Sequence, residues 1–359
     1  MIDSQPRQLR KGRGAVSNPP SRYDSAAPHE MDDGWGILDE DPPPLATTVA
    51  LDTTRSLIAR NRSPDLPFDR SINPYRGCEH GCVYCYARPS HAYLGLSPGL
   101  DFETRLFAKP DAPALLDAEL RKPGYRCRVM ALGTNTDPYQ PIEREYRITR
   151  GLLEVLSRHN HPVAIVTKSY LVVRDLDILA DMASRRLARV YISVTSLSRD
   201  LCRTLEPRAA TPPRRLAAIR ALSGAGIPTG VMVAPIIPAL NDHEIEDILA
   251  AVAEAGACSA AYILLRLPLE VADLFREWLR VHAPLKADHV MSLVRGMRGG
   301  RDYDSTWGRR MTGAGPYAEF IARRFDLAKQ RLGLMGRDWS LDETRFRPPP
   351  RAGDQLSLL

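Results

Sequence analysis

The segment from Ser71 to Arg88, SINPYRGCEHGCVYCYAR, constrains this chain more than any other. It places Cys78, Cys82 and Cys85 in one short loop with the spacing C-x3-C-x2-C. Thiolates are the usual protein ligands of iron–sulfur clusters, so three of them can bind three irons of a cubane [4Fe–4S] cluster. The fourth iron would then be open to another ligand. Glycines beside the cysteines permit the tight turns that such a loop requires.

A zinc site is the main alternative for this loop. Zinc binds Cys and His in tetrahedral sets, and His80 or His91 could complete one with the three cysteines. A disulfide framework is disfavoured, because six cysteines in 359 residues are sparse and no signal peptide is visible. The loop therefore favours the iron–sulfur cluster.

Composition bounds the class of protein. Hydrophobic residues make up 44% of the chain, enough for a substantial core. No apolar run approaches the ~18–20 residues that span a bilayer, and the basic start has no apolar centre, so we expect a cytoplasmic protein without a membrane partner. The net charge of +6 is compatible with nucleic acid as a partner and does not establish it.

Between the cysteine loop and about residue 268, short β-branched runs alternate with longer amphipathic runs. Nearly continuous apolar strands that alternate with helices predict a parallel sheet covered by helices. The expected strands are 71–74, 127–134, 162–169, 189–196, 229–237 and 260–267. The expected helices are 144–158, 175–184, 213–225 and 242–255.

Local signals predict some of the helix ends. Asn241, with Glu244 three residues on, is typical of an N-cap and its capping-box partner. Gly226 and Gly256 stand where two helices should end. Gly315 followed by proline is a good start for a later helix.

The chain is expected to divide into four parts: an irregular, partly disordered extension (1–69), a core (70–300), a helical segment (301–345) and a flexible, proline-rich tail (346–359). The first 22 residues carry several basic side chains and could contact phosphates, although a solvated tail is an equal alternative.

The cysteine loop resembles the cluster-binding loop of the radical S-adenosylmethionine (SAM) superfamily. The resemblance implies a partial (β/α)6 TIM-like barrel with a [4Fe–4S] cluster bound by Cys78, Cys82 and Cys85. It also implies that the open iron binds SAM, which is cleaved to a 5′-deoxyadenosyl radical. Active-site groups of such barrels lie at the carboxyl ends of the strands.

The strand ends resemble those of the spore photoproduct lyase (SplB-like) branch. A hydroxyl residue followed by Asp, here Thr136–Asp137, stands where many radical SAM proteins have Gly-Gly-Glu. Lys168, at the end of the next expected strand, corresponds to a lysine that meets the SAM carboxylate. The residues that the resemblance assigns to cofactor binding are Tyr84, Thr136, Asp137, Lys168, Ser193 and Ala234.

One departure from that branch concerns the substrate. The lyase has a cysteine that donates a hydrogen atom, whereas the corresponding position here is Thr134, whose O–H bond is too strong for that role. We therefore expect a radical SAM enzyme acting on a nucleic acid or a nucleic-acid-associated substrate, as in DNA repair, with an electron donor such as flavodoxin or ferredoxin. The alternatives are modification of a protein or small molecule, and a non-catalytic cluster or zinc protein. Arg266 could reach substrate or pair with an acid.

The last five residues, QLSLL, resemble the motif by which bacterial repair and replication proteins bind the sliding clamp. The resemblance implies clamp contacts by Gln355, Leu356, Leu358 and Leu359. Leu359 stands where the motif has Phe, which should weaken the fit.

Overall fold

The computed structural model describes residues 10–24, 45–336 and 340–350. Its centre is a seven-stranded sheet in which six strands are parallel and β2 adds to one edge antiparallel. In spatial order the strands are β10 (Ser259–Leu264), β9 (Thr229–Ile236), β8 (Ala188–Ser193), β7 (Val163–Thr167), β6 (Met130–Leu132), β3 (Arg70–Ile72) and β2 (Ala59–Arg60). No pairing between β10 and β3 is seen in the part of the chain that the structure describes, so the sheet is that of a partial barrel.

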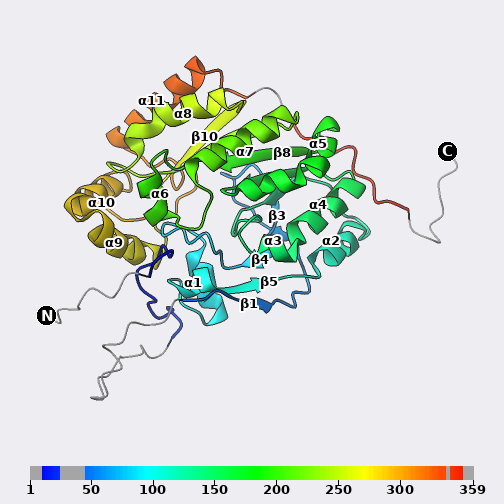
Figure 1. The fold of residues 1–359 in the computed structure, drawn as a ribbon, viewed down its shortest axis with the longest axis horizontal. Helices are drawn as coiled ribbons and strands as arrows, with labels where there is room; N and C mark the ends of the chain where they lie inside the picture. Colours follow the sequence, from blue (N-terminus) through cyan, green and yellow to red (C-terminus); the bar gives the residue numbers. More distant parts are fainter. Residues whose placement is uncertain (1–9, 25–44, 337–339, 351–359) are drawn as a thin grey trace.

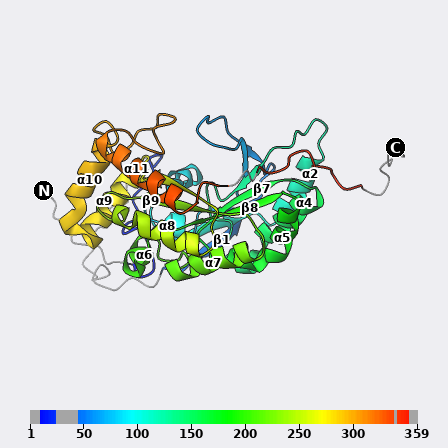
Figure 2. The same ribbon diagram turned by 90° about the horizontal axis from the view of Figure 1, so that it is seen from above.

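Helices between the strands cover one side of this sheet, as Figure 2 shows for α5, α7 and α8. The helices of this layer are α4 (Ile148–Arg158), α5 (Leu176–Ser184), α6 (Arg199–Leu205), α7 (Pro212–Gly224) and α8 (Ile245–Glu254). Short helical turns precede three of them: α3 (Glu143–Tyr146), η3 (Tyr170–Asp175) and η4 (Asp242–Glu244). Most residues of β6, β7 and β9 are apolar and buried or partly buried, which explains why their sequence reads as hydrophobic runs.

A second, smaller sheet lies beside the cysteine loop. It has the order β1 (Thr48–Leu51), β5 (Arg105–Ala108) and β4 (Tyr75–Arg76), and Figure 1 shows it next to α1. The elements between the loop and β6 are η2 (Arg88–Leu94), α1 (Asp101–Thr104) and α2 (Ala112–Leu120). The chain after β10 forms α9 (Val271–His282), η5 (Pro284–Lys286), α10 (Ala287–Gly296) and α11 (Pro316–Arg331).

All six expected strands are confirmed, and so is the partial barrel of radical SAM type. The predicted helix ends at Gly226 and Gly256 are confirmed as well, because both residues have a positive φ just past α7 and α8. The helix expected over 144–158 is broken at Arg147, which has a φ of 50°.

The capping box at Asn241 was a wrong prediction. Its side chain makes no cap bond; it accepts a hydrogen bond from the Ile237 N–H (2.6 Å) and donates to the Thr195 carbonyl (2.7 Å). Glu244 instead accepts from Ser196 Oγ and the Leu197 N–H, both at 2.6 Å. Both side chains therefore join the ends of β8 and β9 rather than capping their own helix.

The described part of the expected extension packs against the core. Ala15 and Val16 are buried, and Arg22 pairs with Glu270 beside α9 at 2.7 Å. Arg13 donates to the Glu103 carbonyl at 3.1 Å. These arginines bind protein groups rather than forming a free basic arm. The four-part division of the chain stays a prediction.

The amino side of the barrel contains a buried histidine whose titration can be tested. His161 Nε2 lies 2.8 Å from the Tyr125 hydroxyl and its Nδ1 lies 3.0 Å from the Pro162 carbonyl, with the Phe346 ring against it. Burial lowers the pKa of His161 to about 4. An unfolded histidine titrates near ~6.5, so the unfolded chain binds more protons between these two pH values.

We predict that the free energy of unfolding falls as the pH drops through this window and that His161→Gln removes part of the fall. Since the folded pKa of His161 is depressed to about 4, its neutral form contributes fully above ~6.5, and about 2 kcal/mol is lost by about pH 5. Urea unfolding at about pH 8 and about pH 5 measures the difference. Exposed His289→Gln is the control, and an equal pH dependence in His161→Gln and wild type would contradict the prediction.

Candidate active site

The cysteine loop lies at the carboxyl side of the sheet, between β4 and η2. Its fold is fixed by backbone hydrogen bonds: the Cys78 N–H donates to the Phe102 carbonyl (2.9 Å), and the Cys85 N–H donates to the Cys82 carbonyl (3.1 Å). All three cysteines are free thiols, and Cys78 and Cys82 are buried. The loop thus presents unpaired thiols inside the protein.

Arg88, three residues after the last cysteine, holds the loop from within. Its guanidinium donates to the carbonyls of Gly81 (3.2 Å) and Cys82 (2.8 Å) and to two further carbonyls in the turn before α1. It also forms an ion pair with Glu103, and both side chains are completely buried. A planar guanidinium with five donors can make this set of bonds, whereas a lysine could not.

Glu103 also binds the N-terminal segment to the same loop. Its carboxylate accepts hydrogen bonds from the backbone N–H groups of Gly14 (2.9 Å) and Ala15 (2.8 Å). A Cβ at Gly14 would lie 1.7 Å from the Gly81 carbonyl oxygen, so only glycine allows this approach. The first described residues therefore close the outer side of the cysteine loop.

The donor set fits an iron–sulfur cluster. Burial raises the pKa of Cys78 well above its usual value, and the neighbouring Cys82 and Cys85 raise it further. Burial likewise raises the pKa of Cys82 to about 12. A thiol binds metal only in its deprotonated form, so the two buried thiols need a strongly positive partner to ionise together. A cluster that binds each thiolate through a different iron provides that charge.

A single zinc ion fits less well. No group of three His, Cys, Asp or Glu side chains in the described ranges is arranged to hold one metal ion. His91 Nε2 lies 3.0 Å from the Arg105 carbonyl, and His80 Nδ1 lies 3.4 Å from Asp137, so both candidate histidines have other neighbours.

Asp137 connects the cysteine loop to the ends of β6 and β7. Its carboxylate accepts hydrogen bonds from Thr167 Oγ1 (2.7 Å), the Lys168 N–H (2.8 Å) and the Tyr139 N–H (2.9 Å), with His80 as the fourth neighbour. Burial would raise the pKa of Asp137, but attraction to His80 and these hydrogen bonds lower it to about 2. Asp137 is therefore ionised and surrounded by donors from the protein.

Gly133 explains how the loop after β6 reaches this position. It has a φ of 87°, and a Cβ there would lie 1.9 Å from the Val166 carbonyl oxygen of β7. A side chain would collide with the neighbouring strand. The absence of one lets residues 134–137 cross the end of β7.

A buried polar cluster surrounds Tyr84, next to the third cysteine. The Tyr84 hydroxyl donates to Glu206, which forms a fully buried ion pair with Arg215. The same hydroxyl lies 3.3 Å from Thr195 Oγ1, at the end of β8. Lys168 Nζ lies 5.7 Å from the centre of the Tyr84 ring. Its positive charge lowers the pKa of Glu206 and opposes the burial that raises the pKa of Cys82.

Lys168 has no carboxylate within ion-pair distance in the described ranges, although it lies among buried groups at the mouth of the barrel. An ammonium in such a place gains from an anionic ligand. This is the feature expected of a residue that meets the carboxylate of a bound cofactor.

The remaining residues predicted to contact SAM lie at the same side of the sheet. They differ in whether their polar groups already bind another protein group. The Thr136 hydroxyl donates to the Tyr75 carbonyl at 3.1 Å, which engages it in the protein. Ser193 is buried, and its hydroxyl makes no hydrogen bond within the described residues. The Ala234 carbonyl accepts from Thr195 Oγ1 at 3.1 Å. Their contacts with SAM stay predictions.

Sequence reasoning missed the charged residues that support the site: Arg88, Glu103, Glu206 and Arg215. They become visible only once their partners are brought together in the fold. The only sequence signal was the position of Arg88 close to Cys85, and no pattern marked the other three.

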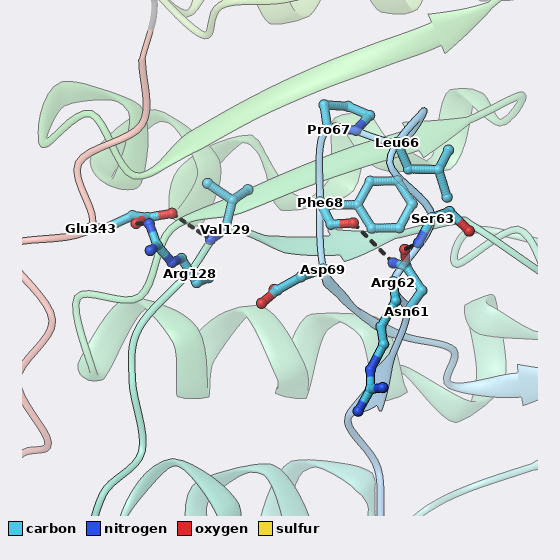
Figure 3. Close-up of a pocket in the computed structure, with 10 residues that line it drawn as sticks. All are labelled: Asn61, Arg62, Ser63, Leu66, Pro67, Phe68, Asp69, Arg128, Val129 and Glu343. Atoms are coloured by element: carbon cyan, nitrogen blue, oxygen red, sulfur yellow. Dashed lines mark hydrogen bonds and ion pairs between the residues drawn. The ribbon is translucent and has the colours of Figure 1, made fainter. Parts of the chain in front are cut away.

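A separate pocket lies at the opposite side of the sheet, at the amino ends of β3 and β6 (Figure 3). It is lined by Asn61, Arg62, Ser63, Leu66, Pro67, Phe68, Asp69, Arg128, Val129 and Glu343. Its lining contains no cysteine and none of the predicted cofactor contacts.

No helix in the described parts of the chain is long and apolar enough to cross a membrane.

The site thus combines three free thiols in one loop with the carboxyl ends of a parallel partial barrel. The sequence model of the radical SAM superfamily matches residues 72–252, about half of the chain, and the protein belongs to that superfamily of enzymes. The uncharacterized protein Rv2578c of Mycobacterium tuberculosis is 40% identical over 233 residues, 63% of this chain and 68% of the relative. The uncharacterized protein MJ0683 of Methanocaldococcus jannaschii is 28% identical over 48% of this chain and 62% of its own length.

The fold is similar to that of spore photoproduct lyase. A structure of that enzyme complexed with dinucleoside spore photoproduct has a TM-score of 0.55 and 18% identity, over 79% of this chain and 78% of the other. A variant of the same lyase with bound AdoMet has a TM-score of 0.55 and 17% identity, over 79% and 78% of the two chains. At this identity the likeness concerns the fold.

We predict that Cys78→Ala, Cys82→Ala or Cys85→Ala abolishes [4Fe–4S] absorbance and SAM cleavage, because each removes one iron ligand. Cys202→Ala and Cys258→Ala are matched controls, since their sulfurs lie beside the carbonyls of Ser196 and Thr229. Iron and sulfide analysis after anaerobic reconstitution measures the outcome. Four irons per chain in a triple variant of the loop would refute the ligand assignment.

We predict that Lys168→Ala weakens SAM binding by ~1–3 kcal/mol, the cost of removing one partner of a charge-assisted hydrogen bond. Cluster content should be retained, because the Lys168 ammonium meets the loop at the Tyr84 ring and supplies no iron ligand. Calorimetric titration with SAM measures the effect, with Lys329→Ala on α11 as the control. Unchanged affinity in Lys168→Ala would contradict its assigned role.

Proposed function

We propose that this protein is a radical SAM enzyme that binds a [4Fe–4S] cluster through Cys78, Cys82 and Cys85 and cleaves SAM. The observation that carries the proposal is the set of three free thiols in one buried loop at the mouth of the barrel. A bound cluster supplies the electron that cleaves the sulfonium of SAM and releases a 5′-deoxyadenosyl radical. The protein positions the reactants and excludes water.

The chain's own residues divide this work. The three cysteines hold the cluster, and Lys168 offers an unpaired ammonium to the SAM carboxylate. Ser193, with its free buried hydroxyl, is suited to a ribose or carboxylate contact, and the backbone at Ala234 to adenine. Asp137 and Thr136 are already bonded within the protein: Asp137 fixes the backbone at Lys168, and Thr136 fixes the backbone at Tyr75, just before the cysteine loop.

The substrate we propose is a nucleic acid or a nucleic-acid-associated molecule. The fold's likeness to a lyase solved with a dinucleoside photoproduct and the net charge of +6 support this class. The reaction differs from that of the lyase at one point, because Thr134 stands at the expected hydrogen-donor position and its carbonyl accepts from the Tyr86 hydroxyl. Modification of a protein or small molecule is the alternative. A non-catalytic role is disfavoured by the unpaired Lys168 at the mouth.

Anaerobic reconstitution with iron and sulfide, followed by SAM and dithionite, tests the proposal. We expect 5′-deoxyadenosine from wild type and none from Cys82→Ala. Production by both, or by neither at full cluster content, would overturn it.

Two partners stay proposals. Reduced flavodoxin or ferredoxin should replace dithionite in the same assay. The sliding-clamp motif, Gln355, Leu356, Leu358 and Leu359, lies outside the described residues, and clamp binding by a peptide of residues 347–359 tests it.

A further inference from the structure

The loop between α10 and α11, residues 297–315, lies beside the mouth of the barrel. Figure 2 shows it in orange on the face of the sheet away from α5, α7 and α8, where the blue loop between β2 and β3 also lies. The Leu264 N–H at the end of β10 donates to the Met311 carbonyl at 2.9 Å. Arg310 pairs with Asp65 of the blue loop at 2.5 Å. The loop is therefore attached to the end of β10 and to the loop that precedes β3.

Two arginines link this loop to the site. Arg298 is buried and donates to the carbonyls of Arg309 (2.7 Å) and Leu265 (2.9 Å). The Arg266 guanidinium lies 4.8 Å from the centre of the Tyr86 ring and 5.9 Å from that of Tyr303. Tyr86 directly follows the third cysteine, so Arg266 places the loop one side chain from the cluster-binding segment.

Two acids also lie in this loop. Asp302 pairs with Arg276 and Arg295, which lie outside residues 297–315. Hydrogen bonds from Thr306 and the charges of Arg309 and Arg298 lower the pKa of Asp304.

Arg266, Arg301 and Arg309 form no ion pair in the described ranges, and the last two are exposed. Arg266 makes its contacts with Tyr303 and Met311 instead of an acid. Of the two functions that the sequence left open for Arg266, pairing with an acid is excluded among the described residues.

Aromatic side chains stand between these arginines. Trp307 is 58% exposed, two residues before Arg309, and Tyr303 follows Arg301 at the same spacing. An exposed tryptophan gains nothing from solvent, but its flat face can stack on a base. Guanidinium groups that alternate with aromatic rings are the combination that binds the phosphates and bases of a single strand.

We infer that residues 301–309 bind a single strand of nucleic acid, with Arg301 and Arg309 on phosphates and Trp307 stacked on a base. Arg266 then faces the strand where it passes closest to the cluster-binding loop. This inference deepens the proposed function, on which it rests, by naming the surface that receives the substrate. An acidic protein is the alternative ligand. It could bind the same arginines, but it has no base to stack on Trp307.

The test is binding of a fluorescent single-stranded DNA of about 30 nucleotides, longer than the ~4–16 nucleotides of a typical single-strand site. Fluorescence anisotropy with the anaerobically reconstituted protein is followed over a series of salt concentrations. Arg301→Gln with Arg309→Gln should reduce the salt slope by about 1.4, because each phosphate contact on a single strand contributes about 0.7. Trp307→Ala should weaken binding roughly 5- to 150-fold.

Matched control variants distinguish binding by this loop from nonspecific attraction of DNA to the basic protein surface. Arg220→Gln with Arg323→Gln removes two exposed arginines from α7 and α11, and Phe320→Ala removes an exposed ring from α11. We expect these controls to bind as wild type does. If the loop variants bind like the controls, or if polyglutamate competes as well as DNA and Trp307→Ala has no effect, the loop assignment is wrong. If wild type does not bind the strand at all, the nucleic-acid substrate is wrong too, while 5′-deoxyadenosine production would still support SAM cleavage.

Discussion

The buried ion pair between Arg88 and Glu103 is the interaction on which the cysteine loop depends. Removing two charges from water is expensive, and the attraction between them compensates only when their other hydrogen-bonding groups are satisfied. Here they are: Arg88 donates to the carbonyls of Gly81 and Cys82, and Glu103 accepts from Gly14 and Ala15. The pair thus fixes the backbone between the first two cysteines without requiring metal.

A second buried pair, Glu206–Arg215, supports the opposite side of the loop by a different means. Glu206 accepts a hydrogen bond from the Tyr84 hydroxyl rather than from the backbone. Arg215 and Lys168 lower the pKa of Glu206, so it carries a negative charge near Lys168. One pair shapes the thiol loop and the other orients the side chain beside it. Loss of a single partner from either would leave a buried charge uncompensated, which typically costs 3–5 kcal/mol.

The strands could be predicted from the sequence because burial on both faces leaves long apolar runs, as in β7 and β9. The cysteine loop could be predicted because its ligands are adjacent in sequence. The supporting charges could not, since 49 basic and 43 acidic residues offer many pairings and only the fold selects Arg88 with Glu103. Asn241 failed for a similar reason: a tertiary contact with Thr195 outcompeted the local cap.

The residues that flank the cysteines explain how the cysteine loop is held relative to the barrel. His80 contacts Asp137 at the ends of β6 and β7, Tyr84 contacts Thr195 at the end of β8, and Tyr86 stacks on Arg266 after β10. The first two contacts are buried polar interactions with defined directions, so they fix the loop on the side where SAM would bind. The third is a stack between a ring and a guanidinium, and the Tyr86 hydroxyl also donates a hydrogen bond to the Thr134 carbonyl after β6. The residues that flank the cysteines therefore attach this loop to the carboxyl ends of β6, β7, β8 and β10.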